Sequence, residues 1–300
     1  MRISTNTIYE LGVTAIQKQQ VDLIKSQQQL STGKRVLTPS DDPIAAAQAL
    51  EIGQTQAINR QYSKNADTAQ SSLQLEESTL NGVVNLIQDV RQRVVNSGDP
   101  TLSSTDLQAF GSELTNSYQQ LLSLANSTDG NGKYLFSGFA GGTQPFTQTS
   151  GAGVYAGDQG QRTIQIGASR TIEVSDSGQN IFKPGVSGQD LFETINTVLT
   201  AFNGGSITST QINTALNGLD AALNNVSKVR SAIGARLNEI DSMKNLNSDL
   251  DTQFSQTLSN LQDVDYTKAI SDLSKQQVNL EAAQKSFVSV TQLSLFNFIS

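Results

Sequence analysis

The sequence predicts a mainly α-helical protein with a β-rich insert, in which the N- and C-terminal segments form a long antiparallel coiled coil or helical bundle. Three observations predict this class. All five prolines lie between Pro39 and Pro184, so both ends permit long uninterrupted helices. Apolar residues recur every seven positions in several segments. Most of the 23 glycines fall between Gly130 and Gly188, which indicates a different structure in the middle.

The N-terminal arm carries one narrow apolar stripe. Its members lie seven residues apart: Tyr9, Ile16, Leu23 and Leu30. One stripe of this width cannot form a core alone, so the arm needs a partner helix. Gly33 is expected to end the helix, because glycine adopts the left-handed C-cap conformation without a steric penalty.

A second helix is expected to begin after a short loop. Ser40 or Asp42 is the expected N-cap, and Pro43 is the expected first helical residue, where its missing N–H costs nothing. The helical pattern continues to about Ser97. It repeats with coiled-coil spacing through Leu73, Leu80, Ile87 and Val94. After the break "SGDPTLSST", a third helix is expected from Leu107, Phe110, Leu114, Leu121 and Leu124.

Alternation replaces the helical spacing in the glycine-rich middle. The stretch "RTIQIGASRTIEVS" predicts two short strands, Arg162–Ile166 and Arg170–Ser175, because apolar residues alternate along each of them. "KYLFS" and "GVYA" are further strand candidates. We expect a small β-rich domain or a set of hairpins between helices.

The longest regular pattern follows a short helix expected around Leu191–Phe202. Positions seven apart predict one continuous helix, about 75 Å long at ~1.5 Å per residue. The row consists of Ile212, Leu219, Val226, Ile233, Ile240, Asn247, Phe254 and Leu261. Asn247 interrupts the apolar row. Either it is buried and fixes the register of a coiled coil, or it faces water at the edge of the stripe.

The last helix also carries a stripe that lacks a partner, and pairing it with the N-terminal arm would satisfy both. The C-terminus is unusually apolar, although chain ends are commonly polar. This favours packing between molecules. The expected assembly interface comprises Ile16, Leu23, Leu30, Ile270, Leu273, Leu280, Phe287, Leu293, Leu295 and Phe296.

The composition limits the possible functions. The 300 residues include no Cys, which excludes disulfides and cysteine nucleophiles, and no His, the usual general base and commonest transition-metal ligand. A net charge of -7 disfavours binding to nucleic acid. No apolar window approaches the ~18 residues of a membrane span, and the N-terminus lacks the apolar core of a cleaved signal. We therefore expect no enzyme, no cofactor, no metal site and no nucleic-acid or membrane partner.

The stretch "STGKRVLTPSDDP" allows two chemical interpretations. A phosphate-binding loop needs Gly where Gln28 stands, and Ser or Thr in place of Arg35 directly after Lys34, so it is not matched. Asp41 and Asp42 could bind a metal ion together, but adjacent acids before a helix-initiating proline are ordinary capping residues. We interpret the stretch as a joint between helices. The expected joint residues are Gly33, Lys34, Arg35, Asp41, Asp42 and Pro43.

Several segments resemble one protein family. "LSTGKRVLTPSDDPIAAAQAL" is similar to the signature at the start of the bacterial flagellin superfamily, and "VRSAIGARLNEID" and "DVDYTKAISDLSKQQVNLEAAQKSF" resemble its C-terminal core. Within the superfamily, "LANSTDGNGKYLFSG" and the ending "LSLFNFIS" are closest to proteins of the hook–filament junction. The resemblance covers roughly the first 138 and the last 75 residues.

The resemblance implies an extracellular structural protein of the flagellum, exported through the type III channel. Residues 1–38 and 265–300 would form an inner coiled-coil layer, 39–129 and 191–264 an α-helical core layer, and 130–190 a β-rich outer domain. A ring of about eleven copies would join the first hook-associated protein to flagellin. An export chaperone would cover the C-terminal helix beforehand. The alternative is a short flagellin that forms the filament itself.

Overall fold

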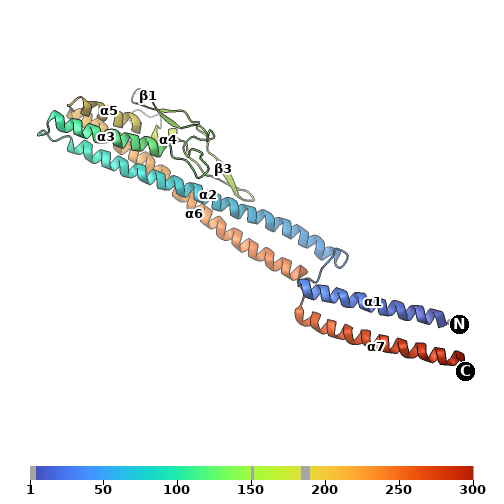
Figure 1. Cartoon of the computed structure of the whole chain (residues 1–300). Helices are drawn as coiled ribbons and strands as arrows, with labels where there is room; N and C mark the ends of the chain where they lie inside the picture. The colour runs from blue at the N-terminus through green and yellow to red at the C-terminus, as the bar shows by residue number, and fades with distance from the viewer. Residues whose placement is uncertain (1–4, 150–151, 184–189, 300) are drawn as a thin grey trace. The chain divides into compact units, whose positions relative to one another are not determined.

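The structure is a computed structural model that describes residues 5–149, 152–183 and 190–299 (Figure 1). Its helices are α1 (Thr5–Thr32), α2 (Pro43–Asn96), α3 (Ser104–Ala125), α4 (Gly178–Phe182), α5 (Leu191–Asn203), α6 (Ser209–Gln262) and α7 (Tyr266–Ile299). The strands in these ranges are β1 (Phe146–Thr149), β2 (Ala152–Tyr155), β3 (Thr163–Gly167) and β4 (Arg170–Glu173). The predicted class, mainly α with a β-rich insert, is confirmed.

The chain divides into two compact units. The terminal unit contains Met1–Ile58 and Leu250–Ser300, and the central unit contains Asn59–Asp249. The boundary falls within α2 and α6, so each of these two helices contributes residues to both units.

In the central unit, α2 and α6 run antiparallel and bury their predicted stripes. The cross-helix pairs give the direction, because Glu77 pairs with Arg230 at 2.6 Å while Arg91, further along α2, pairs with Asp220, earlier on α6, at 2.8 Å. The fully buried heptad positions are Leu73, Leu80, Ile87, Val94, Leu219, Val226, Ile233 and Ile240. Complete burial of each such side chain stabilises the fold by about 1.5–3 kcal/mol, so pairing of the two helices contributes strongly to stability.

Helices α3 and α5 pack against each other and extend this core. Ser103 caps α3 in a capping box: its hydroxyl accepts the N–H of Asp106 at 3.2 Å, and the Asp106 carboxylate accepts the N–H of Ser103 at 2.9 Å. Asp190 caps α5 by accepting the N–H of Glu193 at 3.1 Å. Side-chain caps therefore mark the start of both helices.

The insert consists of two separate antiparallel hairpins. β1 pairs with β2, with Phe146 opposite Tyr155, and β3 pairs with β4, with Thr163 opposite Glu173. The strands expected at residues 162–166 and 170–175 and at "GVYA" are confirmed to within two residues by β3, β4 and β2. The sequence pattern did not predict β1.

The strand expected at "KYLFS", residues 133–137, is wrong. Tyr134 makes an isolated bridge to Thr128, and the residues after it turn instead of extending. Side chains bind the nearby backbone here: the carboxylate of Asp129 accepts the N–H of Lys133 at 2.9 Å before the segment, and the hydroxyl of Ser137 donates to the carbonyl of Tyr134 at 3.2 Å within it. A side chain that binds the nearby backbone thus competes successfully with strand pairing.

Asn247 is buried, with an exposed fraction of 3%, so the alternative in which it faces water is wrong. Its Nδ2 donates to the carbonyl of Ile166 in β3 at 3.2 Å. The main-chain carbonyl of Asn247 accepts a hydrogen bond from Nδ2 of Asn59 in α2 at 2.6 Å. Asn247 therefore connects α6 both to strand β3 of the insert and to the neighbouring long helix α2.

In the terminal unit, α1 pairs with α7 in antiparallel orientation. The rings of Tyr9 and Phe287 lie 5.2 Å apart between centroids. Gly12 leaves room for the second ring, because a Cβ at Gly12 would lie 2.5 Å from Cδ2 of Phe287. The two stripes that lacked partners thus face each other within one chain.

Asn247→Ala is expected to lower the free energy of unfolding by about 1–3 kcal/mol, because the carbonyl of Ile166 would remain buried without its donor. Urea unfolding followed by circular dichroism measures the change. Asn245→Ala is the matched control, since Asn245 is exposed on the same helix, and it is expected to change stability by less than about 0.5 kcal/mol. Equal losses in the two variants would contradict the role of Asn247.

Candidate assembly joint

The candidate site is the joint of the terminal unit. Here α1 leads into α2 through the first linker, residues 33–42, and α6 leads into α7 through the second linker, residues 263–265. Gly33 ends α1 with a φ of +70°, as predicted for a C-cap glycine. The hydroxyl of Tyr266 lies close above it, 2.9 Å from where a Cβ would stand. Glycine is therefore required both by the backbone angle and by the available space.

The two linkers are bonded to each other through the backbone. The N–H of Arg35 donates to the carbonyl of Gln262 at 2.6 Å, and the N–H of Val264 donates to the carbonyl of Gly33 at 2.9 Å. The result is an isolated antiparallel bridge centred on Lys34, whose side chain is exposed. Segments from the two ends of the sequence are thus held together at their main chains.

Asp41 folds the first linker back against α1. One carboxylate oxygen accepts the N–H groups of Leu37 and Thr38 at 3.0 and 2.9 Å. The other oxygen pairs with Nζ of Lys25 in α1 at 2.6 Å. The hydrogen bond from Lys25 is the main reason that the pKa of Asp41 is lowered to about 2. The carboxylate is therefore occupied by a cation and two backbone donors.

Of the two predicted N-cap candidates, Asp42 caps α2 and Ser40 does not, and Pro43 is the first residue of the helix, as predicted. Oδ1 of Asp42 accepts the N–H of Ala45 at 3.0 Å, and this bond is the main cause of the lowered pKa of Asp42. Oδ2 accepts from Nη1 of Arg35 at 3.2 Å. Arg35 also donates through Nη2 to the carbonyl of Leu261 at 2.9 Å. One guanidinium group thereby links the start of α2 to the end of α6.

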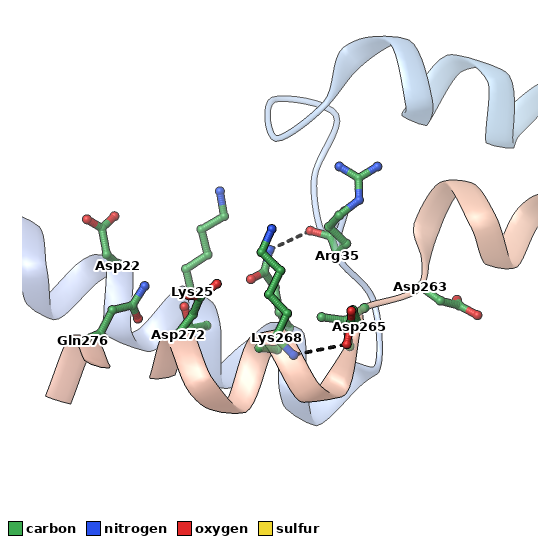
Figure 2. Close-up of a pocket in the computed structure, with 12 residues that line it drawn as sticks. Asp22, Lys25, Arg35, Asp263, Asp265, Lys268, Asp272 and Gln276 are labelled. Atoms are coloured by element: carbon green, nitrogen blue, oxygen red, sulfur yellow. Dashed lines mark hydrogen bonds between the residues drawn. The ribbon is translucent and has the colours of Figure 1, made fainter. Parts of the chain in front are cut away.

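A polar groove of about 600 Å³ lies beside the joint, and Figure 2 shows its charged side chains. They come from α1, the two linkers and α7 and carry both signs of charge: Asp22, Lys25, Arg35, Asp263, Asp265, Lys268 and Asp272. A groove with mixed charges of this kind is better suited to bind a protein surface with complementary charges than a simple anion or cation.

An apolar groove of about 660 Å³ lies on the terminal unit along the start of α2. Its apolar lining is Val36, Leu37, Pro39, Ala46, Ala49, Leu50, Ala57 and Leu258. Leu50 is 66% exposed, and Ile44 nearby in α2 is 73% exposed. Exposed apolar side chains that gather in this way are typical of protein interaction surfaces.

The two acids proposed as a metal pair have other partners in the structure. Asp41 is engaged by Lys25 and the backbone of the first linker, Asp42 is engaged as the N-cap of α2, and no cluster of three possible metal ligands occurs in the described ranges. Within those same ranges, no helix has both the length and the apolar character needed to cross a membrane.

The structure describes the side chains of seven of the ten residues predicted to form the assembly interface. Six of them are half-buried in the seam between α1 and α7: Ile16, Leu23, Leu30, Leu273, Leu280 and Phe287. Ile270 is 52% exposed. Leu293, Leu295 and Phe296 lie outside the residues whose side chains are described. The six form contacts within one chain, and their role between chains stays a prediction.

Sequence reasoning missed several residues of the joint. Lys25 binds Asp41, and Nε2 of Gln29 donates to the carbonyl of Arg35 at 2.7 Å. No pattern in the sequence marks these two residues, because their partners lie outside the helix they belong to. Asp265 caps α7 by accepting the N–H of Lys268 at 3.1 Å. Its position just before a helical pattern was the available signal.

Comparisons with known proteins find similar flagellar proteins along the whole chain. Residues 3–140 match the N-terminal helical region of bacterial flagellin, and residues 216–299 match its C-terminal helical region. Flagellar hook-associated protein 3 of Salmonella typhimurium is 37% identical over 315 residues, which cover 99% of each chain. The flagellin of Bacillus subtilis is 26% identical over 89% of each chain.

A solved structure has the same fold. The putative flagellar hook-associated protein from Vibrio parahaemolyticus superposes with a TM-score of 0.70 over 74% of this chain and 100% of that one, at 24% sequence identity. The chain belongs to the bacterial flagellin family, since its two helical regions match those of flagellin. Within it, the full-length agreement assigns the chain to the flagellar hook-associated protein 3 group.

Gly33→Ala is expected to destabilise the protein by about 1–2 kcal/mol, because alanine is strained at a positive φ. Gly53→Ala is the matched control in the same unit: nothing lies within 4 Å of a Cβ there, and alanine in a helix interior is expected to stabilise it by about 1 kcal/mol. Differential scanning calorimetry measures both. A neutral or stabilising Gly33→Ala variant would rule out the assigned C-cap.

Asp41→Asn is expected to lower the Tm near neutral pH, with a gap to the wild type that closes in acid. The pKa of Asp41 in the folded protein, about 2, lies below the ordinary 3.8. Its ionised form therefore stabilises the fold above the ordinary pKa, and this contribution is lost as the pH falls through about 2. Thermal unfolding between about pH 7 and about pH 2 measures the gap.

Asp272→Asn is the control for that experiment, because it removes a carboxylate from the same groove without touching the first linker. A gap between wild type and Asp41→Asn that stayed constant down to about pH 2 would show that the carboxylate charge is irrelevant.

Proposed function

We propose that this chain is a structural adaptor of the bacterial flagellum that joins the hook to the flagellin filament. The observation that carries the proposal is the match with a hook-associated protein 3 from one end of the chain to the other. A shared fold alone would leave the function open, since one fold serves many functions. Here the agreement includes the insert, the joint and both terminal helices.

The terminal unit supports a role in assembly through apolar side chains that the seam leaves uncovered. On α1 and α7 these are Tyr9, Leu11, Val21, Ile24, Tyr266, Ile270, Val278, Val288 and Val290. A soluble monomer rarely exposes so many large apolar residues on one pair of helices. We infer that neighbouring copies cover them, together with the apolar C-terminus, in a ring of about eleven subunits.

We infer two helical layers and an outer domain from the resemblance to the flagellin family. Residues 1–38 and 265–300 form the inner coiled-coil layer, 39–129 and 191–264 the α-helical core layer, and 130–190 the β-rich outer domain. The joint residues Gly33, Lys34, Arg35, Asp41, Asp42 and Pro43 connect the two helical layers. The backbone bridge between the linkers supports this role, because it holds together the two linkers that would connect the layers.

The partners are the first hook-associated protein on the hook side and flagellin on the filament side. Export through the flagellar type III channel delivers the chain to the outside of the cell, and a chaperone covers the C-terminal helix before export. The apolar ending "LSLFNFIS" supports a need for such cover, since an uncovered apolar helix promotes aggregation.

A short flagellin that forms the filament itself is the second candidate. Its supporting observation is the likeness to a flagellin over 89% of each chain. The lower identity of that match, 26% against 37%, favours the junction.

Immunogold labelling of intact flagella distinguishes the two functions. Antibodies against this chain are expected to label only the base of the filament, while antibodies against flagellin label its whole length. A strain that lacks the gene for this chain is the control for antibody specificity. Gold along the entire filament with the first antibody would overturn the junction function and favour the flagellin alternative.

A further inference from the structure

Glu76 is a buried carboxyl group at the contact between α2 and the β insert. Its exposed fraction is 2%, and Oε1 accepts the N–H of Asp176 at 3.2 Å. Asp176 follows β4 and is itself only 7% exposed. A carboxyl group in such a place is costly to ionise unless a cation compensates for the lost water.

Charged groups from three other segments of the central unit face Glu76: Asp176 after β4, Arg236 in α6 and Arg162 before β3. Arg236 is already engaged by two acids, because its guanidinium pairs with Asp176 at 2.7 Å and with Glu173 at 2.8 Å. An ionised Glu76 would add a third negative charge to this cluster. Burial, and next the charge of Asp176, raise the pKa of Glu76 well above its ordinary value.

The backbone that Glu76 binds is connected to the rest of the insert. Ser177, the residue after Asp176, donates its hydroxyl to the carbonyl of Asp158 at 3.1 Å and lies 3.1 Å from the hydroxyl of Tyr155. The carboxylate of Asp158 in turn accepts the N–H of Phe139 at 2.8 Å. The segment at Asp176 therefore holds two loops of the insert in place.

We propose that Glu76 is a pH-sensitive latch, which fastens residues 174–177 of the insert to α2 while its carboxyl group keeps its proton and loosens them when that proton is lost. The neutral carboxyl accepts the N–H of Asp176 without adding charge to the cluster. Ionisation places a second buried carboxylate beside Asp176 and repels it.

The pH dependence of this opening has a definite direction. The closed state binds the proton of Glu76 more tightly than the open state, in which Glu76 meets water and has its ordinary pKa. The opening constant therefore rises with pH by about tenfold per unit between the ordinary pKa and the raised one, and levels off above the raised pKa.

Hydrogen exchange of the full-length protein, followed by mass spectrometry between about pH 5 and about pH 9 and corrected for intrinsic exchange, measures this opening. Protection in peptides that cover residues 174–177 is expected to fall by about tenfold per pH unit over part of that range. Peptides from α3 serve as the reference and are expected to keep constant protection. A protection that does not change with pH in wild-type residues 174–177 would overturn the latch.

The decisive variant is Glu76→Gln, which keeps the acceptor oxygen and can never ionise. Its protection at residues 174–177 is expected to be independent of pH. Glu77→Gln is the matched control, because Glu77 is the next residue but pairs with Arg230. It is expected to retain the pH dependence of the wild type. Parallel pH profiles for Glu76→Gln and wild type would assign the effect to another group and overturn the latch.

A measurement on the wild type keeps the test independent of how the variants fold. Difference infrared spectroscopy detects the C=O band of a protonated carboxylic acid. That band is expected to persist through the pH range in which protection falls, where exposed Glu is already ionised, and to disappear at the higher pH where protection levels off. Loss of this band at the same pH as the bands of exposed carboxyl groups would also overturn the latch.

Discussion

The structure depends on one constraint: each long helix has an apolar stripe too narrow to be buried by its own neighbours in sequence. α1 is therefore paired with α7, and α2 with α6, so the pairing of each long helix joins the first part of the chain to the last. Contacts between such distant segments carry a high loop-closure cost and form late in folding. Neither long helix of a pair can bury its apolar stripe before the other helix exists.

The periodic part of this arrangement can be predicted from the sequence, and the contacts that hold it together cannot. Pro43, Asp42 and Gly33 act locally, so helix ends follow from residue type alone. The pairing of Lys25 with Asp41 and of Arg35 with the carbonyl of Leu261 depends on how the chain folds back. Asn247 shows the limit most clearly, since its position in the heptad was visible while its partner, a strand carbonyl, was not.

The β insert is fastened to both long helices of the central unit. Nδ2 of Asn65 in α2 donates to the carbonyl of Gln165 at 2.7 Å, and Arg170 pairs with Glu239 in α6. Together with the buried bonds of Asn247 and Glu76, these contacts hold the hairpin β3–β4 across the pair of helices. The insert thus adds polar cross-links to a helix pair whose own interface is mainly apolar, and it restricts sliding of one helix along the other.

The backbone bridge between the two linkers has a mechanical consequence. A tension applied along α1 reaches the linker at Gly33 and Arg35, and their hydrogen bonds to Val264 and Gln262 share that force with the second linker. Because the bonds are made by main-chain atoms, this sharing tolerates most side chains in the linkers, with proline and any replacement of Gly33 as the exceptions. A joint that divides a load over two covalent connections lowers the peak stress on either one.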